Sequence, residues 1–326
     1  MLQLLYAQLA RSRRRYYQRH SDLRRRLARP VVSVGNLTVG GSGKTPIAAE
    51  IARLLLEHGD RPSILSRGYG RVSPVEGVVI VSNSSEVRAD VAQAGDEPFM
   101  LATALPGCAV VVCGDRYLAG RVAEVELGCT VHVLDDGFQH FRLMRDLDLL
   151  VVAPEDLSDT RTLPFGRFRE PLDAAASADA VLVAAGGQLS AEEVRDRLKV
   201  NLAYVFHRRV HPPDHDLPVF AFAGIAKPER FFGDLEQSGW KVTGRKSFPD
   251  HHWYTDDEVA RIRRAARDAG AVRIVTTAKD LVRLRLQPSR LGSAADPEIV
   301  AVRLEVSIEP AFDLWLHERL APLHAA

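Results

Sequence analysis

The stretch VVSVGNLTVGGSGKTP, residues 31–46, decides the fold. Its first four residues form a largely β-branched apolar run, typical of a buried strand. After the glycine-rich loop, the pattern IAAEIARLLLEHG predicts a helix over residues 45–57 that stops near Gly59. Strand, loop, Gly-Lys-Thr and helix follow one another as in a P-loop, where backbone N–H groups and the helix N-terminus converge on phosphate oxygens. The sequence therefore predicts a phosphate-binding loop in an α/β fold.

The end of this loop carries the predicted nucleotide site. Lys44 can reach the β- and γ-phosphates, and the Thr45 hydroxyl can bind Mg²⁺. One position departs from the general G-x-x-x-x-G-K-[ST] pattern, because Thr38 stands where its first glycine would be. The alternative is a glycine-rich turn with an exposed lysine, which the flanking strand and helix disfavour. The expected nucleotide-binding residues are Gly40, Gly41, Ser42, Gly43, Lys44 and Thr45.

A second signal comes from an apolar strand that ends in acidic residues. The segment VHVL at 131–134 leads into Asp135, Asp136 and Gly137. Such a strand matches a Walker B element, which holds Mg²⁺ directly or through water. Asp-Gly also makes ordinary turns, so the motif is weak by itself. Its occurrence together with the Gly-Lys-Thr loop favours the metal site.

Strand and helix patterns alternate along the first part of the chain. This alternation predicts a mostly parallel sheet flanked by helices, with ligand-binding loops at the carboxyl ends of the strands. We expect a P-loop NTPase-like kinase domain at 1–205, a smaller α/β domain at 206–307, and a C-terminal helix within 308–326 that could pack on the first domain. The patterns occur at residues 31–34, 45–57, 62–66, 98–105, 109–113, 115–126, 131–134, 148–152 and 180–184.

Composition excludes several classes of protein. The chain has 326 residues, of which 46% are hydrophobic and 26% charged, so wholesale disorder is excluded. No run of about 18 apolar residues predicts a transmembrane helix, and the N-terminal residues lack the features of a secretory signal. The three cysteines show no metal-ligand spacing and are expected to be reduced thiols in a cytoplasmic protein.

The N-terminal segment 1–29 is strongly basic. It holds nine arginines and one acidic residue, Asp22, for a net charge of +8 in a chain whose total is +1. An apolar stripe at helical spacing predicts an amphipathic helix that Pro30 ends, with arginines placed to reach lipid phosphates. Docking of this helix on its own domain and RNA binding are the alternatives. The stripe consists of Leu2, Leu5, Leu9, Tyr16, His20, Leu23 and Leu27.

Motifs spread over most of the chain resemble one known family, the tetraacyldisaccharide 4′-kinases, which are the lipid A 4′-kinases of Gram-negative bacteria. LDDGFQH beside GNLTVGGSGKTP is the most specific combination, and Thr38 accords with the pattern of this family. The matching stretches are SVGNLTVGGSGKTP (33–46), LSRGYGR (65–71), AGDEP (94–98), DRYLAG (115–120), LDDGFQH (134–140), LPFGRFREP (163–171), FAGIAKPERFF (222–232), FPDHHWYTDDE (248–258) and TTAKD (276–280).

The resemblance implies an ATP-dependent kinase that moves the γ-phosphate to the 4′-hydroxyl of a tetraacylated glucosamine disaccharide 1-phosphate in lipid A (lipopolysaccharide) biosynthesis. ATP and Mg²⁺ would be the cofactors. The enzyme would be a peripheral membrane protein at the cytoplasmic face of the inner membrane, in contact with it through the N-terminal helix. The expected partners are this acylated disaccharide 1-phosphate lipid and the membrane surface, with no nucleic acid and no obligate protein partner.

A catalytic pair is implied by the same resemblance. Asp96, which precedes the apolar helical run FMLATAL, is the candidate base, although it could instead cap that helix with Pro98 in the first turn. The family pairs an Asp in AGDEP with a His in the DHH stretch. His251 is preferred over His252 as the residue that orients Asp96 and shares its proton. A surface role for these histidines is the alternative.

The remaining candidates are metal ligands and phosphate-binding side chains. Arginine suits phosphate because its planar guanidinium bonds oxygens in pairs, although each arginine could also lie on a solvated face. His140 could serve in packing, and Lys279 with Asp280 could form a structural ion pair. By resemblance, Thr45, Asp135, Asp136 and Gln139 would serve Mg²⁺, Lys44 would act in catalysis, and Arg67, Tyr69, Arg71, Arg116 and Arg169 would bind substrate phosphates.

Two other functions share some of these features. A P-loop GTPase or ATPase of the metallochaperone or ligase-like type has the same loop and acidic strand. Against it, the sequence has no cysteine–histidine cluster, and residues 277–280 match the guanine-binding signal only loosely. A nucleotide-gated protein that binds the membrane surface is the non-enzymatic alternative.

Overall fold

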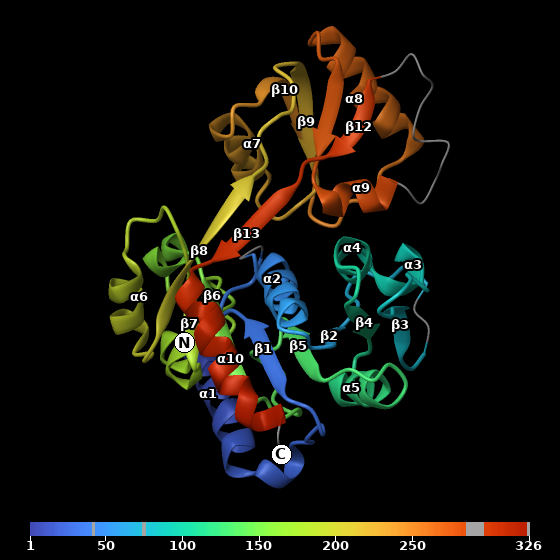
Figure 1. Cartoon of the computed structure of the whole chain (residues 1–326). Helices are drawn as coiled ribbons and strands as arrows, with labels where there is room; N and C mark the ends of the chain where they lie inside the picture. The colour runs from blue at the N-terminus through green and yellow to red at the C-terminus, as the bar shows by residue number, and fades with distance from the viewer. Residues whose placement is uncertain (41–42, 74–75, 285–296, 325–326) are drawn as a thin grey trace.

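The computed structural model describes residues 1–40, 43–73, 76–284 and 297–324. Two sheets form two bodies, a large one and a small one, and β8 and β13 run between them (Figure 1). The large sheet has the order β13-β8-β7-β6-β1-β5-β2-β4-β3. Its edge strands β13 and β3 pair antiparallel and its other pairs are parallel, which confirms the predicted mostly parallel sheet. The strands are β1 (Val31–Gly35), β2 (Pro62–Ser66), β3 (Val79–Ser82), β4 (Ala109–Val112), β5 (Val131–Asp135), β6 (Leu147–Val152), β7 (Ala180–Ala184), β8 (Ala203–Val210) and β13 (Leu304–Ile308).

Helices cover both faces of the large sheet and bury its valines and leucines. On one face, Ile47 and Ile51 of α2 pack in the same cluster as Phe312 and Leu316 of α10. On the other face, residues of α5 and α6 belong to two separate clusters. The helices of this body are α1 (Leu2–Arg19), α2 (Lys44–Glu57), α3 (Val91–Ala94), α4 (Asp96–Ala104), α5 (Arg116–Val125), α6 (Ala191–Leu198) and α10 (Pro310–His324), with 3₁₀ turns η1 (Ser21–Leu23), η2 (Pro154–Ser158) and η3 (Leu172–Ser177).

The small body is built on a four-stranded parallel sheet with the order β10-β9-β11-β12. Apolar clusters on its two faces centre on Phe222 and on Phe232. The expected division at residues 206 and 307 falls inside β8 and β13, which pair with each other in the large sheet. Its elements are β9 (Pro218–Ala223), α7 (Pro228–Gln237), β10 (Lys241–Ser247), α8 (Asp256–Asp268), β11 (Arg273–Thr276), α9 (Ala278–Leu284) and β12 (Glu298–Ala301).

The N-terminal helix is shorter than the sequence pattern predicts. The prediction of helix up to Pro30 is wrong, because α1 ends at Arg19. Beyond a 3₁₀ turn the chain is extended, and Arg25 exchanges backbone hydrogen bonds with Arg142 and Met144 at 2.8 and 2.9 Å. These bonds to a neighbouring segment take the place of helical ones. None of the described helices is long and apolar enough to cross a membrane.

The carboxyl ends of β1 and β5 meet at a close contact. A Cβ atom on Gly35 would lie 2.4 Å from Phe138 Cβ and 2.7 Å from its backbone nitrogen. The Gly137 N–H donates to the carbonyl of Val34 at 3.0 Å. Glycine at position 35 therefore lets the loop after β5 lie directly against the start of the glycine-rich loop.

We expect Gly35→Ala to destabilise the protein by about 1–3 kcal/mol, because the added methyl group overpacks the contact with Phe138. The unfolding midpoint in urea measures the effect. Gly233→Ala, within α7, is the matched control, since its Cβ would meet nothing within 4 Å. That change should leave stability equal or slightly higher. Equal midpoints for Gly35→Ala and the wild type would contradict the rigid contact.

Candidate active site

The glycine-rich loop and the acidic strand end lie side by side, as predicted. β1 and β5 are neighbours, with Val34 in register with Asp135. Lys44 begins α2 after Gly43, whose φ of 83° is the left-handed conformation that favours glycine. Lys44 Nζ lies 3.5 Å from Asp136 Oδ1, and Thr45 Oγ1 donates to Asp135 Oδ2 at 3.2 Å. Gly41 and Ser42 lie outside the described residues.

The two neighbouring carboxylates have different electrostatic environments. Burial, with repulsion from Glu97 and Asp136, raises the pKa of Asp135 to about 7, although Lys44 and Thr45 oppose the rise. Burial also disfavours the charged form of Asp136, but Lys44 and Arg169 outweigh it and hold the pKa of Asp136 below its usual value. Asp135 is thus a buried carboxylate whose negative charge is incompletely compensated. Such an environment suits a bound cation.

Arg169 and Gln139 join this group from the neighbouring loops. Arg169 Nη1 donates to Asp136 Oδ1 and Oδ2 at 3.0 and 2.9 Å, and to Gln139 Oε1 at 3.4 Å. Gln139 Nε2 donates to the carbonyl of Asn36 at 2.9 Å. These bonds connect the loop after β5 to the chain after β1.

Arg116 is buried beside the same carboxylates. Its Nη1 donates to the carbonyls of Cys113 and Gly114 at 3.4 and 3.3 Å, while its buried Nε has no hydrogen-bond partner among the described residues. Burial, followed by repulsion from Arg67, lowers the pKa of Arg116 to about 10, against attraction by Asp135 and Asp136. A buried guanidinium with an unused donor is suited to an anionic ligand.

Arg67, Tyr69 and Arg71, three more of the predicted residues, follow β2 and have different surroundings. Tyr69 is 69% exposed, and its ring meets that of His251 edge-on at 5.4 Å. Arg71 Nε donates to the carbonyl of Gly68 at 3.2 Å, within the turn. Arg67 is exposed and repels both Arg116 and His140. Burial, followed by repulsion from Arg116, Arg145 and Arg67, lowers the pKa of His140 to about 4.

Asp96 is the meeting point of the two bodies. It is the first residue of α4 and is only 3% exposed, and the N-cap position belongs to Gly95. Its Oδ2 lies 3.1 Å from His251 Nδ1 and 2.9 Å from Arg283 Nε, both from the small body. Burial opposes ionisation, but His251, Lys279 and Arg283 together hold the pKa of Asp96 far below its usual value. The carboxylate is therefore a charged acceptor at neutral pH.

The two adjacent histidines have different partners. Lys279 Nζ lies 3.3 Å from His251 Nε2, and a ring that accepts this bond at Nε2 carries a proton on Nδ1, which then donates to Asp96. His252 Nε2 pairs instead with Glu258 Oε2 at 3.0 Å, and its ring stacks on Phe248. Of the two, His251 is the residue that contacts the candidate base.

Lys279 and Arg283 lie in the cluster around Asp96, where the sequence analysis did not place them. Lys279 does not pair with Asp280: its Nζ donates to Glu97 Oε1 at 3.0 Å and to Asp250 Oδ1 at 3.4 Å. Asp280 faces Arg283, whose Nη1 lies 3.4 Å away. The spacing of four residues between the two cations suggests a shared helix face, but the sequence does not show what that face meets.

Comparison with known proteins accords with this geometry. The family model described as tetraacyldisaccharide-1-P 4′-kinase matches residues 1–321. The chain belongs to the tetraacyldisaccharide-1-phosphate 4′-kinase family. It is similar to the tetraacyldisaccharide 4′-kinase of Geobacter metallireducens, with 42% identity over 87% of this chain and 86% of the relative. Identity to that of Pelobacter propionicus is 40%, over 94% of this chain and 88% of the relative.

A solved structure of the family covers the whole fold. The crystal structure of LpxK from Aquifex aeolicus, in complex with ATP, is 31% identical and has a TM-score of 0.77, over 99% of this chain and 100% of that one. The activity of the present kinase is that of a tetraacyldisaccharide 4′-kinase in lipid A biosynthesis. Family membership thus decides against the metallochaperone-like and purely binding alternatives.

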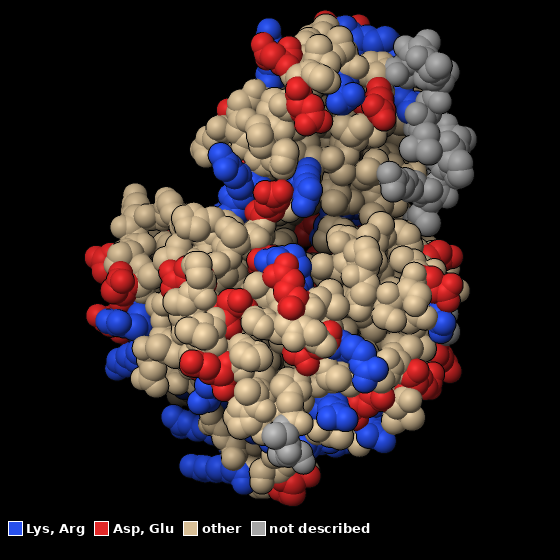
Figure 2. Space-filling model, viewed as in Figure 1, with Lys and Arg blue, Asp and Glu red and all other residues tan. Residues whose placement is uncertain are grey.

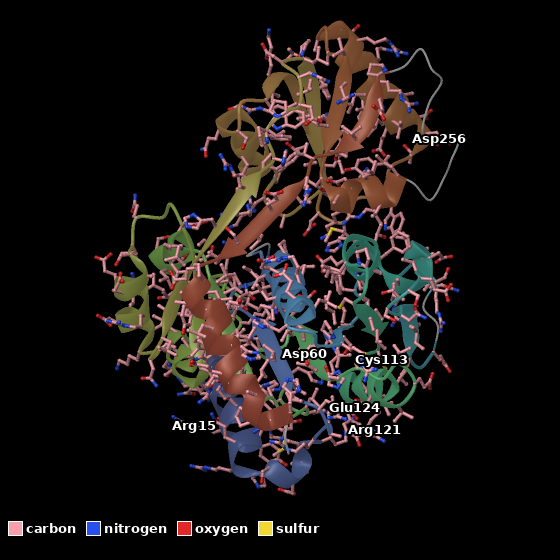
Figure 3. The ribbon with its side chains drawn as sticks, in the orientation of Figure 1. Arg15, Asp60, Cys113, Arg121, Glu124 and Asp256 are labelled. Atoms are coloured by element: carbon pink, nitrogen blue, oxygen red, sulfur yellow. The ribbon has the colours of Figure 1, made fainter. Side chains whose placement is uncertain are left out.

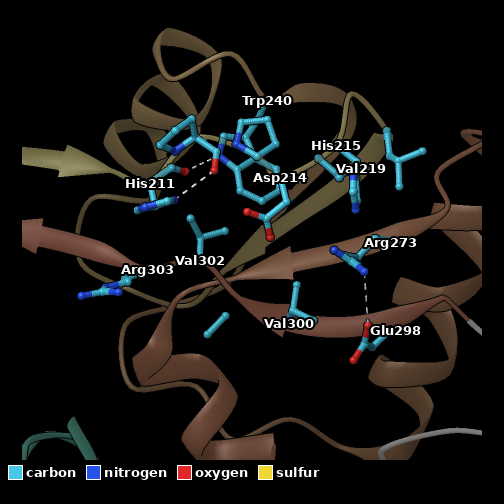
Figure 4. A pocket seen from close by; sticks show the side chains of 14 residues that line it. His211, Asp214, His215, Val219, Trp240, Arg273, Glu298, Val300, Val302 and Arg303 are labelled. Atoms are coloured by element: carbon cyan, nitrogen blue, oxygen red, sulfur yellow. Dashed lines mark hydrogen bonds and ion pairs between the residues drawn. The ribbon is translucent and has the colours of Figure 1, made fainter.

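A cavity of about 400 Å³ lies apart from the clustered acids and arginines. It is in the small body, beside the segments that connect β8 to β9 and β12 to β13 (Figure 4). His211, Asp214 and Trp240 are among its lining residues, and Arg273 pairs with Glu298 at its edge at 3.6 Å. None of the predicted site residues lines it.

We expect Lys44→Ala to lower the rate of phosphoryl transfer by about 10²–10³-fold, because it removes a preorganised charge at the loop where the sequence predicts that phosphate oxygens bind. The measurement is the initial rate of phosphorylation of the tetraacyldisaccharide 1-phosphate at saturating ATP. Lys241→Ala, on the exposed surface of β10, is the control and should keep the wild-type rate. A Lys44→Ala enzyme with full activity would contradict the assignment.

Proposed function

We propose that this kinase transfers the γ-phosphate of ATP to the 4′-hydroxyl of the tetraacylated disaccharide 1-phosphate, with Asp96 as the base and His251 as its orienting partner. The contact that carries the proposal is the 3.1 Å separation of Asp96 Oδ2 and His251 Nδ1. A buried carboxylate that is held ionised by groups from a second body is suited to receive a proton in a closed cleft.

The nucleotide would lie on the loop that precedes α2. Lys44 and Thr45 stand at the helix N-terminus beside the acidic pair, where phosphate oxygens are favoured. The proposal also includes the neighbouring loop residues, of which Gly41 and Ser42 lie outside the described residues. The residues that would bind the phosphates are Gly40, Gly41, Ser42, Gly43, Lys44 and Thr45.

The donor set fits Mg²⁺. Thr45, Asp135, Asp136 and Gln139 offer the hydroxyl, carboxylate and amide oxygens that this ion binds. Among the described residues no group of three His, Cys, Asp or Glu side chains is placed to hold a metal alone. This accords with an ion that takes much of its coordination from phosphate and water. When bound, Mg²⁺ would neutralise charge on the transferring phosphoryl group.

Arginines would provide the remaining charge for the phosphates. Arg116, which both acidic residues attract, has an Nε without a partner among the described residues, and Arg169 bridges Asp136 and Gln139. Arg67, Tyr69 and Arg71 follow the neighbouring strand β2. We assign these five residues to the phosphates of substrate and nucleotide.

In the transfer step, a bond forms between the 4′-oxygen and the γ-phosphorus while the bond between the γ-phosphorus and the bridging oxygen of ADP breaks. The hydroxyl proton passes to Asp96. Because the transition state is loose, the proton leaves late, and correct placement of the hydroxyl matters more than the strength of the base. A carboxylate with a depressed pKa can therefore serve.

We expect Asp96→Asn to lower kcat by about 10²–10⁴-fold with little change in the KM for ATP, because the amide cannot accept the proton. Steady-state kinetics with ATP and the lipid acceptor measure this. Asp90→Asn is the matched control: Asp90 caps α3 through Gln93 N, and asparagine caps equally well. An unchanged kcat for Asp96→Asn would remove Asp96 as the base.

We further propose that α1 contacts the cytoplasmic surface of the inner membrane beside the substrate site. Leu2, Leu4, Leu5 and Leu9 are all more than half exposed on α1. Lys and Arg side chains project at the lower left of the molecule, where α1 lies (Figures 1 and 2). An exposed apolar face flanked by arginines is typical of a helix at a membrane interface.

The same helix is fixed to the large body by its other face. The Tyr6 hydroxyl donates a hydrogen bond to the carbonyl of Arg169 at 3.1 Å. Arg14 is buried: its Nε and Nη2 donate to the carboxylate of Glu170 at 2.7 and 2.8 Å. Its guanidinium also lies 4.5 Å from the centre of the Phe138 ring. The membrane-facing leucines are thereby held close to the residues assigned to the substrate.

We expect the double change Arg15→Gln, Arg19→Gln to weaken binding to vesicles that contain anionic lipid by about 10–30-fold at low salt, at about 1 kcal/mol per arginine. Both side chains are exposed on α1, and Arg15 is labelled in Figure 3. Vesicle sedimentation over a range of salt concentrations measures the effect, and the difference should shrink as salt rises. Arg261→Gln, Arg264→Gln on α8 is the control. Vesicle binding that changes neither with salt concentration nor on substitution of the α1 arginines would contradict the proposal.

A further inference from the structure

Arg283 is a fully buried arginine of the small body that binds a carboxylate of the large body. Its side chain has no exposed surface. Nε donates to Asp96 Oδ2 at 2.9 Å, and Nη2 donates to the same oxygen. Nη1 donates to the carbonyl of Gly224 at 3.0 Å. All three guanidinium nitrogens therefore have acceptors, and two of them bind one oxygen of Asp96.

A second buried acid fixes the orientation of this guanidinium. Asp280, which is fully buried, lies 3.4 Å from Arg283 Nη1. It also accepts hydrogen bonds from the hydroxyls of Tyr254 and Thr277 at 2.8 and 2.6 Å, and from Gly224 N at 3.1 Å. Asp280 is thus satisfied within the small body, and the excess donors of Arg283 are directed across the interface.

The two carboxylate oxygens of Asp96 differ in their remaining capacity to accept hydrogen bonds. Oδ2 faces Arg283 and His251, with Lys279 Nζ 3.9 Å away. Oδ1 accepts one bond, from Glu97 N at 2.9 Å. A carboxylate oxygen offers about two acceptor sites, so Oδ2 is saturated and Oδ1 keeps capacity for another donor.

We propose that Arg283 is a positioning residue that fixes Asp96 through Oδ2, so that Oδ1 is the oxygen that receives the proton of the substrate hydroxyl. This inference rests on the proposed role of Asp96 as the base. Because Arg283 belongs to α9, it positions Asp96 only while the small body is docked on α4. The titratable and charged groups that face Asp96 are His251 and its neighbour Asp250, Lys279 and Arg283 of the small body, and Glu97 of its own helix.

The first test is Arg283→Lys, which keeps the positive charge but cannot bind Asp96 and Gly224 together. We expect kcat to fall about 10–100-fold, as a misplaced reacting group does, with the KM for ATP within about twofold of the wild type. Thr276→Val is the control for stability: it removes a buried hydrogen bond to the carbonyl of Phe222 in the same body, away from Asp96. It should lower the melting temperature and leave kcat unchanged.

The second test is the pH profile of Arg283→Gln. Arg283 helps to depress the pKa of Asp96, so its loss raises that pKa. Since the base must be ionised, the acid limb of kcat/KM should then move to higher pH than in the wild type. A merely structural role would change stability without this movement.

The outcomes separate the two proposals. A wild-type kcat or a raised kcat for Arg283→Lys, while Asp96→Asn is inactive, would overturn the positioning role and leave the base in place. Activity retained in Asp96→Asn would overturn the base itself, whatever Arg283→Lys does. Loss of kcat together with an unmoved acid limb in Arg283→Gln would also contradict positioning through Asp96.

Discussion

The close packing of the β1 and β5 strand ends is the constraint on which the site depends. Parallel neighbours bring their carboxyl ends to one edge of the sheet, so the glycine-rich loop and the acidic pair must share that edge. At Gly35 the contact leaves no room for a side chain. The fold thereby holds Lys44 and Thr45 against Asp136 and Asp135. Groups held in place in this way require little rearrangement when charged ligands bind.

The large body alone does not complete the site. Asp96 is held ionised and oriented by side chains that all come from the small body, His251 from the loop before α8 and Lys279 and Arg283 from α9. Elsewhere between the bodies, Lys227 pairs with Asp156 at 3.3 Å and Arg230 with Glu155 at 3.4 Å. At these contacts the small body offers cations and the large body offers acids. This complementarity connects docking of the bodies to the state of the candidate base, because undocking would strip Asp96 of its partners.

The sequence predicted what depends on local patterns, and missed what depends on contacts between distant segments. β2 lies where the apolar run placed it, and the family motifs located Asp96 and His251. β8 was missed because its polar outward residues, AYVFHRRV, give a weak strand signal near the Pro-rich segment. The role of Arg283 was missed for another reason. Its neighbours are apolar, and only the fold shows that an arginine in LVRL reaches a carboxylate 187 residues away in the chain.

The N-terminal segment shows how charge counted along a sequence overstates the charge available to a partner. Four of the nine arginines in residues 1–29 form ion pairs with acids of the large body. Arg14 is largely removed from solvent, and its pair, Glu170, adjoins Arg169 of the site. The arginines of this segment therefore divide between two roles, ion pairing within the protein and attraction of an anionic surface. Ion-paired arginines such as Arg14 fix the segment to the large body, and the exposed arginines outside these pairs are left to attract an anionic surface. The membrane contribution of α1 should accordingly follow its exposed face, not its total charge.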